Sequence, residues 1–124
     1  MKVRDYECDL QGIVNNAVYQ HYLEHARHEF ITEAGMDFAA MHREGTDPVV
    51  SRIEIDYKTP LTSGDEFQVC LNVSREGKLK LIIDQDIFRK SDKRLVVKAK
   101  VFIVCLRNGR PIPAEDVFGP IIGP

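Results

Sequence analysis

The feature that most constrains the fold is an amphipathic helical pattern that begins near residue 16 and ends at Gly35. Asn15 or Asn16 can cap its first turn, because an asparagine side chain accepts a hydrogen bond from a free backbone N–H. Gly35 suits the position after the last turn. A helix with one apolar face needs a second layer to cover that face. The apolar residues recur at the spacing of one helical face: Tyr19, Tyr22, Leu23, Ala26, Phe30 and Ala34.

Segments with the alternating pattern of half-buried strands follow the helix. The fourth of them hardly alternates over Val101–Leu106, which indicates a central strand that is covered on both faces. A helix followed by antiparallel strands predicts an α+β domain, in which a curved antiparallel sheet wraps around one long central helix. The expected strands are residues 49–59, 66–74, 79–88 and 95–106.

Three further segments complete the expected element order. Residues 2–9 alternate well enough for a short first strand. Residues 36–47 are expected to form a connector that contains a helical turn. Asn108 and Gly109 form a tight-turn pair. The tail beyond them is expected to be irregular, because it contains four prolines: Pro111, Pro113, Pro120 and Pro124.

The loop that leads into the helix contains Asp9, Gly12 and two asparagines. The first N–H groups of a helix lack intrahelical acceptors and lie at the positive end of its dipole, so they can stabilise a carbonyl oxygen that gains negative charge. Gly12 permits a sharp turn and a close approach of a ligand. An acidic or basic side chain beside such donors is the smallest set of catalytic groups that acyl transfer needs. Aspartate, glycine and asparagine are also common turn residues, and spacing alone favours a structural turn.

Two motifs extend this loop into a family resemblance. The string Arg4–Tyr19 (RDYECDLQGIVNNAVY) and the motif Glu24–Arg27 (EHAR) resemble the 4-hydroxybenzoyl-CoA thioesterase-like branch of the hotdog superfamily. The longer string is similar to acyl-lipid and 1,4-dihydroxy-2-naphthoyl-CoA thioesterase-like proteins. The resemblance covers nearly the whole chain and implies a single hotdog domain over residues 1–124. It also implies hydrolysis of acyl thioesters that are carried by coenzyme A or by acyl carrier protein.

The resemblance implies a role for each residue that matches the motif. Asp9 matches the catalytic carboxylate, which acts as nucleophile or as general base on water, and Gly12 matches the loop glycine beside the acyl group. Asn16 matches the position whose backbone N–H polarises the thioester carbonyl. Asn15 and Tyr19 lie in the same motif and are expected to bind the substrate.

The polar residues within the helix leave several interpretations open. Glu24 matches an acidic position with a variable role: it could orient water or the thioester, or pair with His28 or a partner chain. Arg27 is expected to be a structural ion-pair partner. His21, His25 and His28 have helical spacing, but a third ligand and the HExxH motif are missing, so no metal is expected.

Coenzyme A and phosphopantetheine bring phosphate to the site as parts of the substrate, and no separate cofactor is expected. Phosphate requires cationic or hydrogen-bonding side chains near the mouth of the site. Arg89 and Lys90 lie in a basic loop over residues 89–94, although a solvated hairpin tip explains such a loop equally well. Lys58 with Thr59 is the second candidate.

Two alternatives compete with hydrolysis. A hotdog hydratase or dehydratase pairs a histidine with an acidic residue, and the loop over residues 9–16 contains no histidine. A non-catalytic acyl-CoA-binding domain does not need a carboxylate such as Asp9 beside the thioester. The histidine-based mechanism of the plant acyl-carrier-protein enzymes does not transfer either, because Gln11 and Ile13 stand where those enzymes have Asn and His.

Composition and resemblance together limit the partners. A formal net charge of -2 gives no bias towards nucleic acid or anionic membranes. No apolar run approaches the ~20 residues that span a membrane, and the first residues lack the apolar core of a signal peptide. Cys8, Cys70 and Cys105 form no zinc or disulfide pattern, which suits a reducing cytoplasm, and Cys8 is interpreted as a small buried residue. The resemblance implies a homodimer, or a homotetramer, whose sheets pair and whose active sites are built from two chains.

Overall fold

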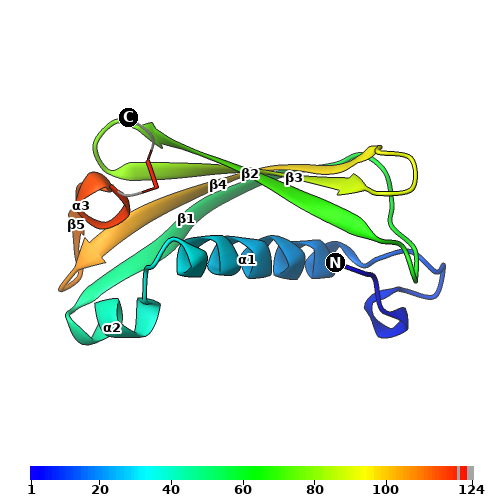
Figure 1. Cartoon of the computed structure of the whole chain (residues 1–124), viewed down its shortest axis with the longest axis horizontal. Coiled ribbons are helices and arrows are strands. Elements are labelled where there is room, and N and C mark those ends of the chain that lie inside the picture. The colour runs from blue at the N-terminus through cyan, green and yellow to red at the C-terminus, as the bar shows by residue number, and fades with distance from the viewer. Residues whose placement is uncertain (120, 123–124) are drawn as a thin grey trace.

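The protein is built from one long helix beneath one curved antiparallel sheet (Figure 1). The computed structural model describes residues 1–119 and 121–122. The helix is α1 (Asn16–Glu33), and the strands of the sheet are β1 (Thr46–Tyr57), β2 (Phe67–Glu76), β3 (Lys80–Arg89), β4 (Leu95–Arg107) and β5 (Arg110–Ile112). The strand order is β1-β4-β3-β2, and β5 pairs with β4. This is the α+β hotdog arrangement that the sequence predicted, and the prediction is confirmed.

Both ends of α1 form as their sequences predict. The side chain of Asn15 accepts a hydrogen bond of 3.0 Å from the backbone N–H of Ala17, so Asn15 is the N-cap. Gly35 follows the last turn with φ of +89°, a left-handed conformation that favours glycine. A short helix, α2 (Phe38–Arg43), lies in the connector to β1, as expected.

The buried face of α1 differs from the predicted stripe in its second half. Tyr22 and Leu23 are buried as predicted, whereas Ala34 is exposed and Arg27 and Ile31 are buried instead. The shift follows from a partner on the sheet, because the buried Gln85 of β3 accepts a hydrogen bond from the Arg27 guanidinium. A polar partner across the layers therefore brings a charged side chain under the sheet.

The strands match the predicted pattern closely. β4 lies between β1 and β3, and its residues from Val101 to Ile103 are all buried, which confirms a central strand covered on both faces. Asn108 and Gly109 both have positive φ and form the tight turn between β4 and β5. β1 pairs only with β4 in the part of the chain that the structure describes, so its other side is a free sheet edge.

Two predicted segments are wrong. Residues 2–9 form no strand; they contain a 3-10 helix, η1 (Asp5–Glu7), and make only isolated bridges, because their polar side chains offer no apolar row to a sheet. The tail is not wholly irregular, since it contains β5 and the short helix α3 (Glu115–Phe118), whereas Pro120 and Pro124 lie outside the described residues. Within the described residues, no helix combines the length and the apolar character needed to cross a membrane.

We predict that Leu23→Ala destabilises the protein by about 2 to 5 kcal/mol, because it leaves a cavity between α1 and the sheet. Leu23 is only 1% exposed. Urea unfolding followed by circular dichroism measures the change. The matched control is Leu79→Ala, in a hairpin where the leucine is exposed, which we expect to change the free energy of unfolding by less than about 0.5 kcal/mol. Equal losses in both variants would contradict the assigned core.

Candidate active site at the start of the central helix

The loop before α1 is closed by hydrogen bonds to Asp9. The backbone N–H of Asp9 donates to the carbonyl of Ile13 at 2.8 Å, and the N–H of Gly12 donates to the carbonyl of Asp9 at 3.0 Å. The Asp9 carboxylate accepts at Oδ1 from the N–H groups of Gln11 (2.8 Å) and Ile13 (3.4 Å). Gly12 has φ of +80°, so the turn favours glycine there.

One carboxylate oxygen of Asp9 therefore builds the turn, and the other is available. Asp9 is exposed, and its Oδ2 has no hydrogen-bond partner among residues 1–119 and 121–122. The structural and the catalytic interpretations of Asp9 are thus compatible, because they use different oxygens.

The first turn of α1 has one unused donor. The N–H of Asn15 donates to the Glu7 carbonyl, and the N–H groups of Ala17 and Val18 donate to the side chain and the carbonyl of Asn15. The backbone N–H of Asn16 has no acceptor in the described part of the chain. It lies at the positive end of the helix dipole, where a developing negative charge on a ligand oxygen is stabilised.

Leu61 anchors this loop to the helix. Its carbonyl accepts from the N–H of Val14 at 2.8 Å, and its own N–H donates to the Tyr19 hydroxyl at 2.9 Å. Leu61 is fully buried, and Tyr19 is 3% exposed. Burial raises the pKa of the Tyr19 phenol, so it stays neutral and can accept this bond. Tyr19 therefore lies buried and supports the loop through Leu61.

Cys8 is half-buried at the edge of the core rather than fully buried as predicted. Burial raises the pKa of the Cys8 thiol, and the negative charges of Asp5 and Asp9 raise this pKa further. A raised pKa favours the neutral thiol over the nucleophilic thiolate. The carboxylate of Asp9 is therefore a better candidate nucleophile than Cys8.

The basic loop after β3 reaches the same end of the molecule. Arg89 forms a bidentate pair with Asp92, at 3.0 Å and 2.5 Å, and also donates to the carbonyl of Pro60 at 3.3 Å. Pro60 directly precedes Leu61. The hydrogen bond from Arg89 to Pro60 therefore connects the basic loop to the segment that anchors the Asp9 loop. The guanidinium of Arg89 is thus engaged within the chain, whereas Lys90 is exposed.

Lys58 and Thr59 lie on the connection between β1 and Pro60. Their backbone N–H groups both donate to the carbonyl of Val96, at 2.8 Å and 3.2 Å. The Lys58 side chain is exposed and Thr59 is half-buried. These two residues and the basic loop therefore flank the segment that holds the Asp9 loop.

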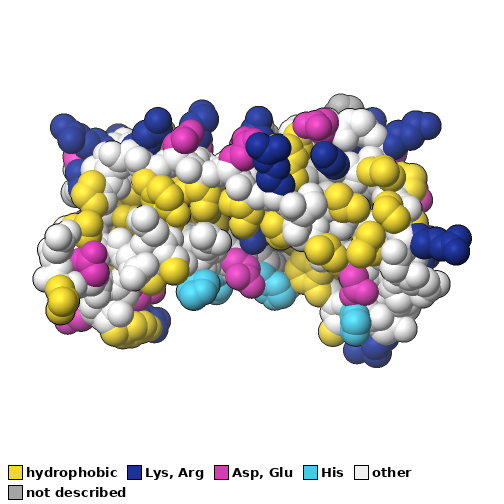
Figure 2. Space-filling view, turned by 180° about the vertical axis from the view of Figure 1, so that it is seen from behind, with side chains coloured by type: hydrophobic (Ala, Val, Ile, Leu, Met, Phe, Trp, Pro, Cys, Tyr) yellow, Lys and Arg dark blue, Asp and Glu magenta, His cyan; other side chains and the backbone are white. Residues whose placement is uncertain are grey.

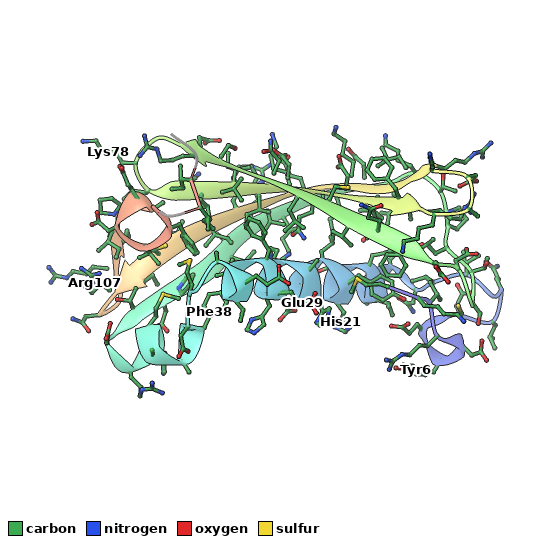
Figure 3. All side chains as sticks on the ribbon, in the orientation of Figure 1. Tyr6, His21, Glu29, Phe38, Lys78 and Arg107 are labelled. Carbon is green, nitrogen blue, oxygen red and sulfur yellow. The ribbon has the colours of Figure 1, made fainter. Side chains whose placement is uncertain are left out.

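Glu24 is not part of this cluster. It lies on α1 eight residues after Asn16 (24 − 16 = 8), about 12 Å along the helix at 1.5 Å per residue. Among the described residues it forms no ion pair with His28. Arg27 is not the expected ion-pair partner either, because its partner is the neutral amide of Gln85. His21 projects from the side of α1 that faces away from the sheet (Figure 3).

Sequence reasoning missed two residues that shape the molecule around this site. Leu61 lies in a turn between two predicted strands. The one sequence feature that could have indicated its burial is that an apolar residue directly follows Pro60. Gln85 is fully buried among the alternating residues of β3, where a hydrophobic residue is usual. A glutamine in a position of the inward-facing row is the signal that could have identified it.

Comparison with known protein families identifies the class to which the loop, the helix start and the sheet belong. Residues 3–120 match the model of the Thioesterase-like superfamily. This span includes the Asp9 loop, α1 and the whole sheet. The chain therefore belongs to this family, and the resemblance of the motifs around Asp9 is confirmed at the level of the family.

Individual relatives agree with the family. The chain is 37% identical over 113 residues to the chloroplastic acyl-acyl carrier protein thioesterase ATL3 of Arabidopsis thaliana, which is 90% of this chain but only 60% of that relative's length. A hypothetical protein from Aquifex aeolicus has a similar structure, with a TM-score of 0.87, 29% identity and coverage of 98% and 95% of the two chains. The 1,4-dihydroxy-2-naphthoyl-CoA thioesterase Slr0204 from Synechocystis, with 17% identity, a TM-score of 0.90 and coverage of 98% and 91%, shares the fold.

We predict that the Arg89–Asp92 pair stabilises the protein above about pH 4 and loses this effect at lower pH. The hydrogen bonds from Arg89 lower the pKa of Asp92 from 3.8 to about 2, so folding favours the ionised carboxylate. The contribution is complete above the unfolded pKa and disappears as pH falls through about 2. Denaturant unfolding of the native protein and of Asp92→Asn, from pH 5 down to pH 2, measures it. The two free energies of unfolding should converge at low pH, and a constant difference would contradict the pairing.

Proposed function

We propose that this protein hydrolyses acyl thioesters to a free acid and a thiol. The observation that carries the proposal is the free backbone N–H of Asn16 at the start of α1, next to a loop in which Asp9 offers an available carboxylate oxygen. These two groups supply an oxyanion donor and an acid–base or nucleophilic group, which acyl transfer requires. Membership of the thioesterase-like family supports the proposal.

In this mechanism the thioester carbonyl accepts a hydrogen bond from Asn16, which stabilises the oxyanion that forms during attack. Asp9 then acts in one of two ways. Its oxygen attacks the carbonyl carbon, the C–S bond breaks, and water hydrolyses the resulting anhydride; or it removes a proton from water, which attacks directly. In both routes the sulfur leaves as the thiol. Gly12 leaves room for the acyl group beside the backbone.

The carrier is coenzyme A or the phosphopantetheine arm of acyl carrier protein, as part of the substrate. Lys90 is an exposed cation of the basic loop, Lys58 is an exposed cation on the connection after β1, and Thr59 adds a hydroxyl next to Lys58 in the chain. We assign phosphate binding chiefly to the two lysines. Arg89 contributes by holding the basic loop, since its guanidinium is paired with Asp92. The name of the Arabidopsis relative supports acyl carrier protein as one carrier.

We further propose a homodimer that pairs through the free edge of β1, and a homotetramer as a dimer of such dimers. An unpaired strand edge is a template for another chain. Val49, Val50 and Tyr57 are exposed at 43%, 41% and 43% along this strand. Figure 2 shows hydrophobic side chains in a band across one face, above histidine and acidic side chains.

Two-fold pairing of β1 places the start of this strand in one chain beside the end of the same strand in its partner. Tyr57, at one end, packs on Tyr19 with ring centroids 5.7 Å apart, and so marks the helix start. The other end, at Thr46, follows α2 and the end of α1. In such a dimer the Asp9 loop of one chain lies beside the second half of α1 in its partner.

The free thiols support a reducing compartment. Cys8, Cys70 and Cys105 are all unpaired with one another. We propose the cytoplasm on this basis. In an oxidising compartment, the exposed Cys70 would be open to oxidation or to intermolecular pairing.

We predict that Asp9→Asn lowers thiol release from acyl-CoA or acyl-carrier-protein esters by about a hundredfold or more. The amide keeps an oxygen that can accept the turn's hydrogen bonds, so the loop and the free energy of unfolding should be preserved. Asp9→Ala removes both functions, and should lose activity and stability together. A colorimetric thiol assay and thermal unfolding measure the two properties.

The same panel separates the competing functions. Full activity in Asp9→Asn would contradict the mechanism. Tight binding of the esters by the native protein without thiol release would favour an acyl-CoA-binding domain. Addition of water to an enoyl ester would favour a hydratase.

We predict that Val50→Asp converts the dimer into a monomer, because it places a charge at the free edge of β1. Sedimentation velocity measures the change. Leu79→Asp is the matched control, since Leu79 is exposed to a similar degree (43% against 41%) but lies in the hairpin between β2 and β3. A dimer in both variants, or a monomeric native protein, would contradict the proposed interface.

A further inference from the structure

The basic loop between β3 and β4 carries an excess of positive charge. Residues 89–94 contain four basic residues and one acidic residue, although the formal net charge of the whole chain is -2. Arg89 and Asp92 neutralise each other through their bidentate pair. Figure 2 shows Lys and Arg side chains along the upper edge of the molecule, including the end that bears this loop. The charges that remain belong to three exposed residues of the loop: Lys90, Lys93 and Arg94.

These three cations are not committed to acidic partners within the chain. Lys90 and Lys93 form no ion pair among residues 1–119 and 121–122. Arg94 approaches the Asp92 carboxylate only to 3.7 Å, and its side chain is 70% exposed. The side chain of Arg89, which is bound to Asp92, is 19% exposed. The loop therefore presents its unpaired charge to solvent on a pair of residues that is already neutral.

The backbone of the loop does not explain why Lys93 is a lysine. The N–H of Lys93 donates to the carbonyl of Arg89 at 2.8 Å, and the N–H of Arg89 donates to the carbonyl of Arg94 at 2.9 Å, so the turn is closed. Lys93 has φ of +59°, in the left-handed region that favours glycine. A glycine would complete the same turn without the steric cost. A side chain that is kept at such a position points to a function for that side chain.

A hollow beside the loop adds an apolar surface to these charges. Its volume is about 520 Å³, and its lining combines the half-buried ring of Phe88 with Gln68 and the cations Lys90 and Lys93. Arg94 is outside that lining, so the positive charge extends beyond the hollow. One phosphate group needs donors that converge on a single point. Charges spread around an apolar hollow instead suit the face of a protein that combines acidic and apolar side chains.

The loop is also connected to the candidate active site. Arg89 donates to the carbonyl of Pro60 at 3.3 Å, and the next residue, Leu61, accepts a hydrogen bond from Val14 at the end of the Asp9 loop. Figure 1 shows the turn between β3 and β4 at the same end of the molecule as the segment that leads into α1. A protein bound on the basic loop would therefore be held beside the Asp9 loop.

We propose that the basic loop docks an acidic carrier protein, and that the preferred substrate is a thioester on the phosphopantetheine arm of that protein. Lys93 and Arg94 pair with carboxylates of the carrier, and an apolar side chain of the carrier enters the hollow beside Phe88. Lys58 and Lys90 keep the role in phosphate binding that is proposed above. The proposal rests on the proposed thioesterase function, and it names the carrier that the function left open.

The chemistry of acyl carrier proteins fits this surface. They are small, acidic and helical, and acidic side chains three or four residues apart lie on one face of a helix. Such a face can contact several spread cations at the same time and still present an apolar residue between them. Complementary charges at the rim of an interface raise the rate of association and select the partner. They should therefore act on kcat/KM through KM, and leave the chemical step unchanged.

The test compares three decanoyl thioesters that differ only in the carrier: a bacterial acyl carrier protein, coenzyme A, and pantetheine, which has neither phosphate nor protein. We expect the native protein to have the highest kcat/KM for the carrier-protein ester. This value should fall about tenfold or more when salt rises from about 0.05 M to about 0.5 M, because salt screens exposed charges. The uncharged pantetheine ester should be insensitive to salt.

A double variant reverses the charges that we assign to docking. Lys93→Glu with Arg94→Glu should lower kcat/KM for the carrier-protein ester by about tenfold to a hundredfold, mainly through KM, because like charges then face each other. The pantetheine ester should change by less than about twofold. The matched control is Lys78→Glu with Lys80→Glu, which reverses two exposed lysines at the opposite end of the sheet, where Figure 3 labels Lys78. The control should keep the native rates for all three esters.

A third variant separates docking from stability. Lys93→Gly removes the cation and also the strain of its left-handed backbone, so it should raise the unfolding temperature while it lowers kcat/KM for the carrier-protein ester severalfold. Equal losses in the double variant and its control would overturn the proposal. A double variant that loses activity equally on the coenzyme A ester would also overturn it, since the loop would then bind a nucleotide. A native preference for the coenzyme A ester would have the same consequence.

Failure of this inference differs from failure of the proposed function. Calorimetry with the unacylated carrier protein measures docking without any reaction. If Asp9→Asn abolishes thiol release but the Lys93 and Arg94 variants act like native protein, the thioesterase function stands and docking on the loop is rejected. If no ester is hydrolysed but the carrier protein binds the native protein and not the double variant, docking stands and the hydrolytic function is rejected.

Discussion

The candidate site depends on the two backbone hydrogen bonds of Leu61. Its carbonyl accepts from Val14, and its N–H donates to the hydroxyl of Tyr19. One bond holds the end of the Asp9 loop, and the other holds the first turns of α1. Because Leu61 is fully buried, neither bond competes with water. The loop, the helix start and the strand connection are therefore one rigid unit, which holds the Asp9 loop against the first turns of α1.

Within that unit, the structural role of Asp9 in the turn is compatible with the catalytic role that we propose for it. Its Oδ1 accepts the hydrogen bonds that shape the turn, and its Oδ2 remains available. A carboxylate that is held by one oxygen has little freedom to rotate, which reduces the entropy cost of using the other in a reaction. In the proposed mechanism, the turn that Asp9 builds would also orient its carboxylate.

Arg27 shows how the sheet changes the character of the helix. The pattern of α1 alone predicts that Arg27 is exposed and that Ala34 is buried. In the structure Arg27 is buried and Ala34 is exposed, because the amide of Gln85 supplies a fixed acceptor for Arg27 under the sheet. The first half of α1 supports the Asp9 loop through aromatic packing, and the second half lines a cavity with a buried cation. One helix therefore contributes to two different polar environments.

The sequence by itself determined α1, the four long strands, the Asn108–Gly109 turn and the position of Asp9, because periodicity, caps and turns depend on neighbouring residues. It failed for residues 2–9 and for Arg27. The contacts that decide these features join residues far apart in the chain: 58 residues separate Arg27 from Gln85, and 42 separate Tyr19 from Leu61. Only the tertiary structure brought such partners together. It alone decided that the N–H of Asn16 has no acceptor among residues 1–119 and 121–122, that Arg89 is engaged by Asp92, and that a charged side chain lies under the sheet.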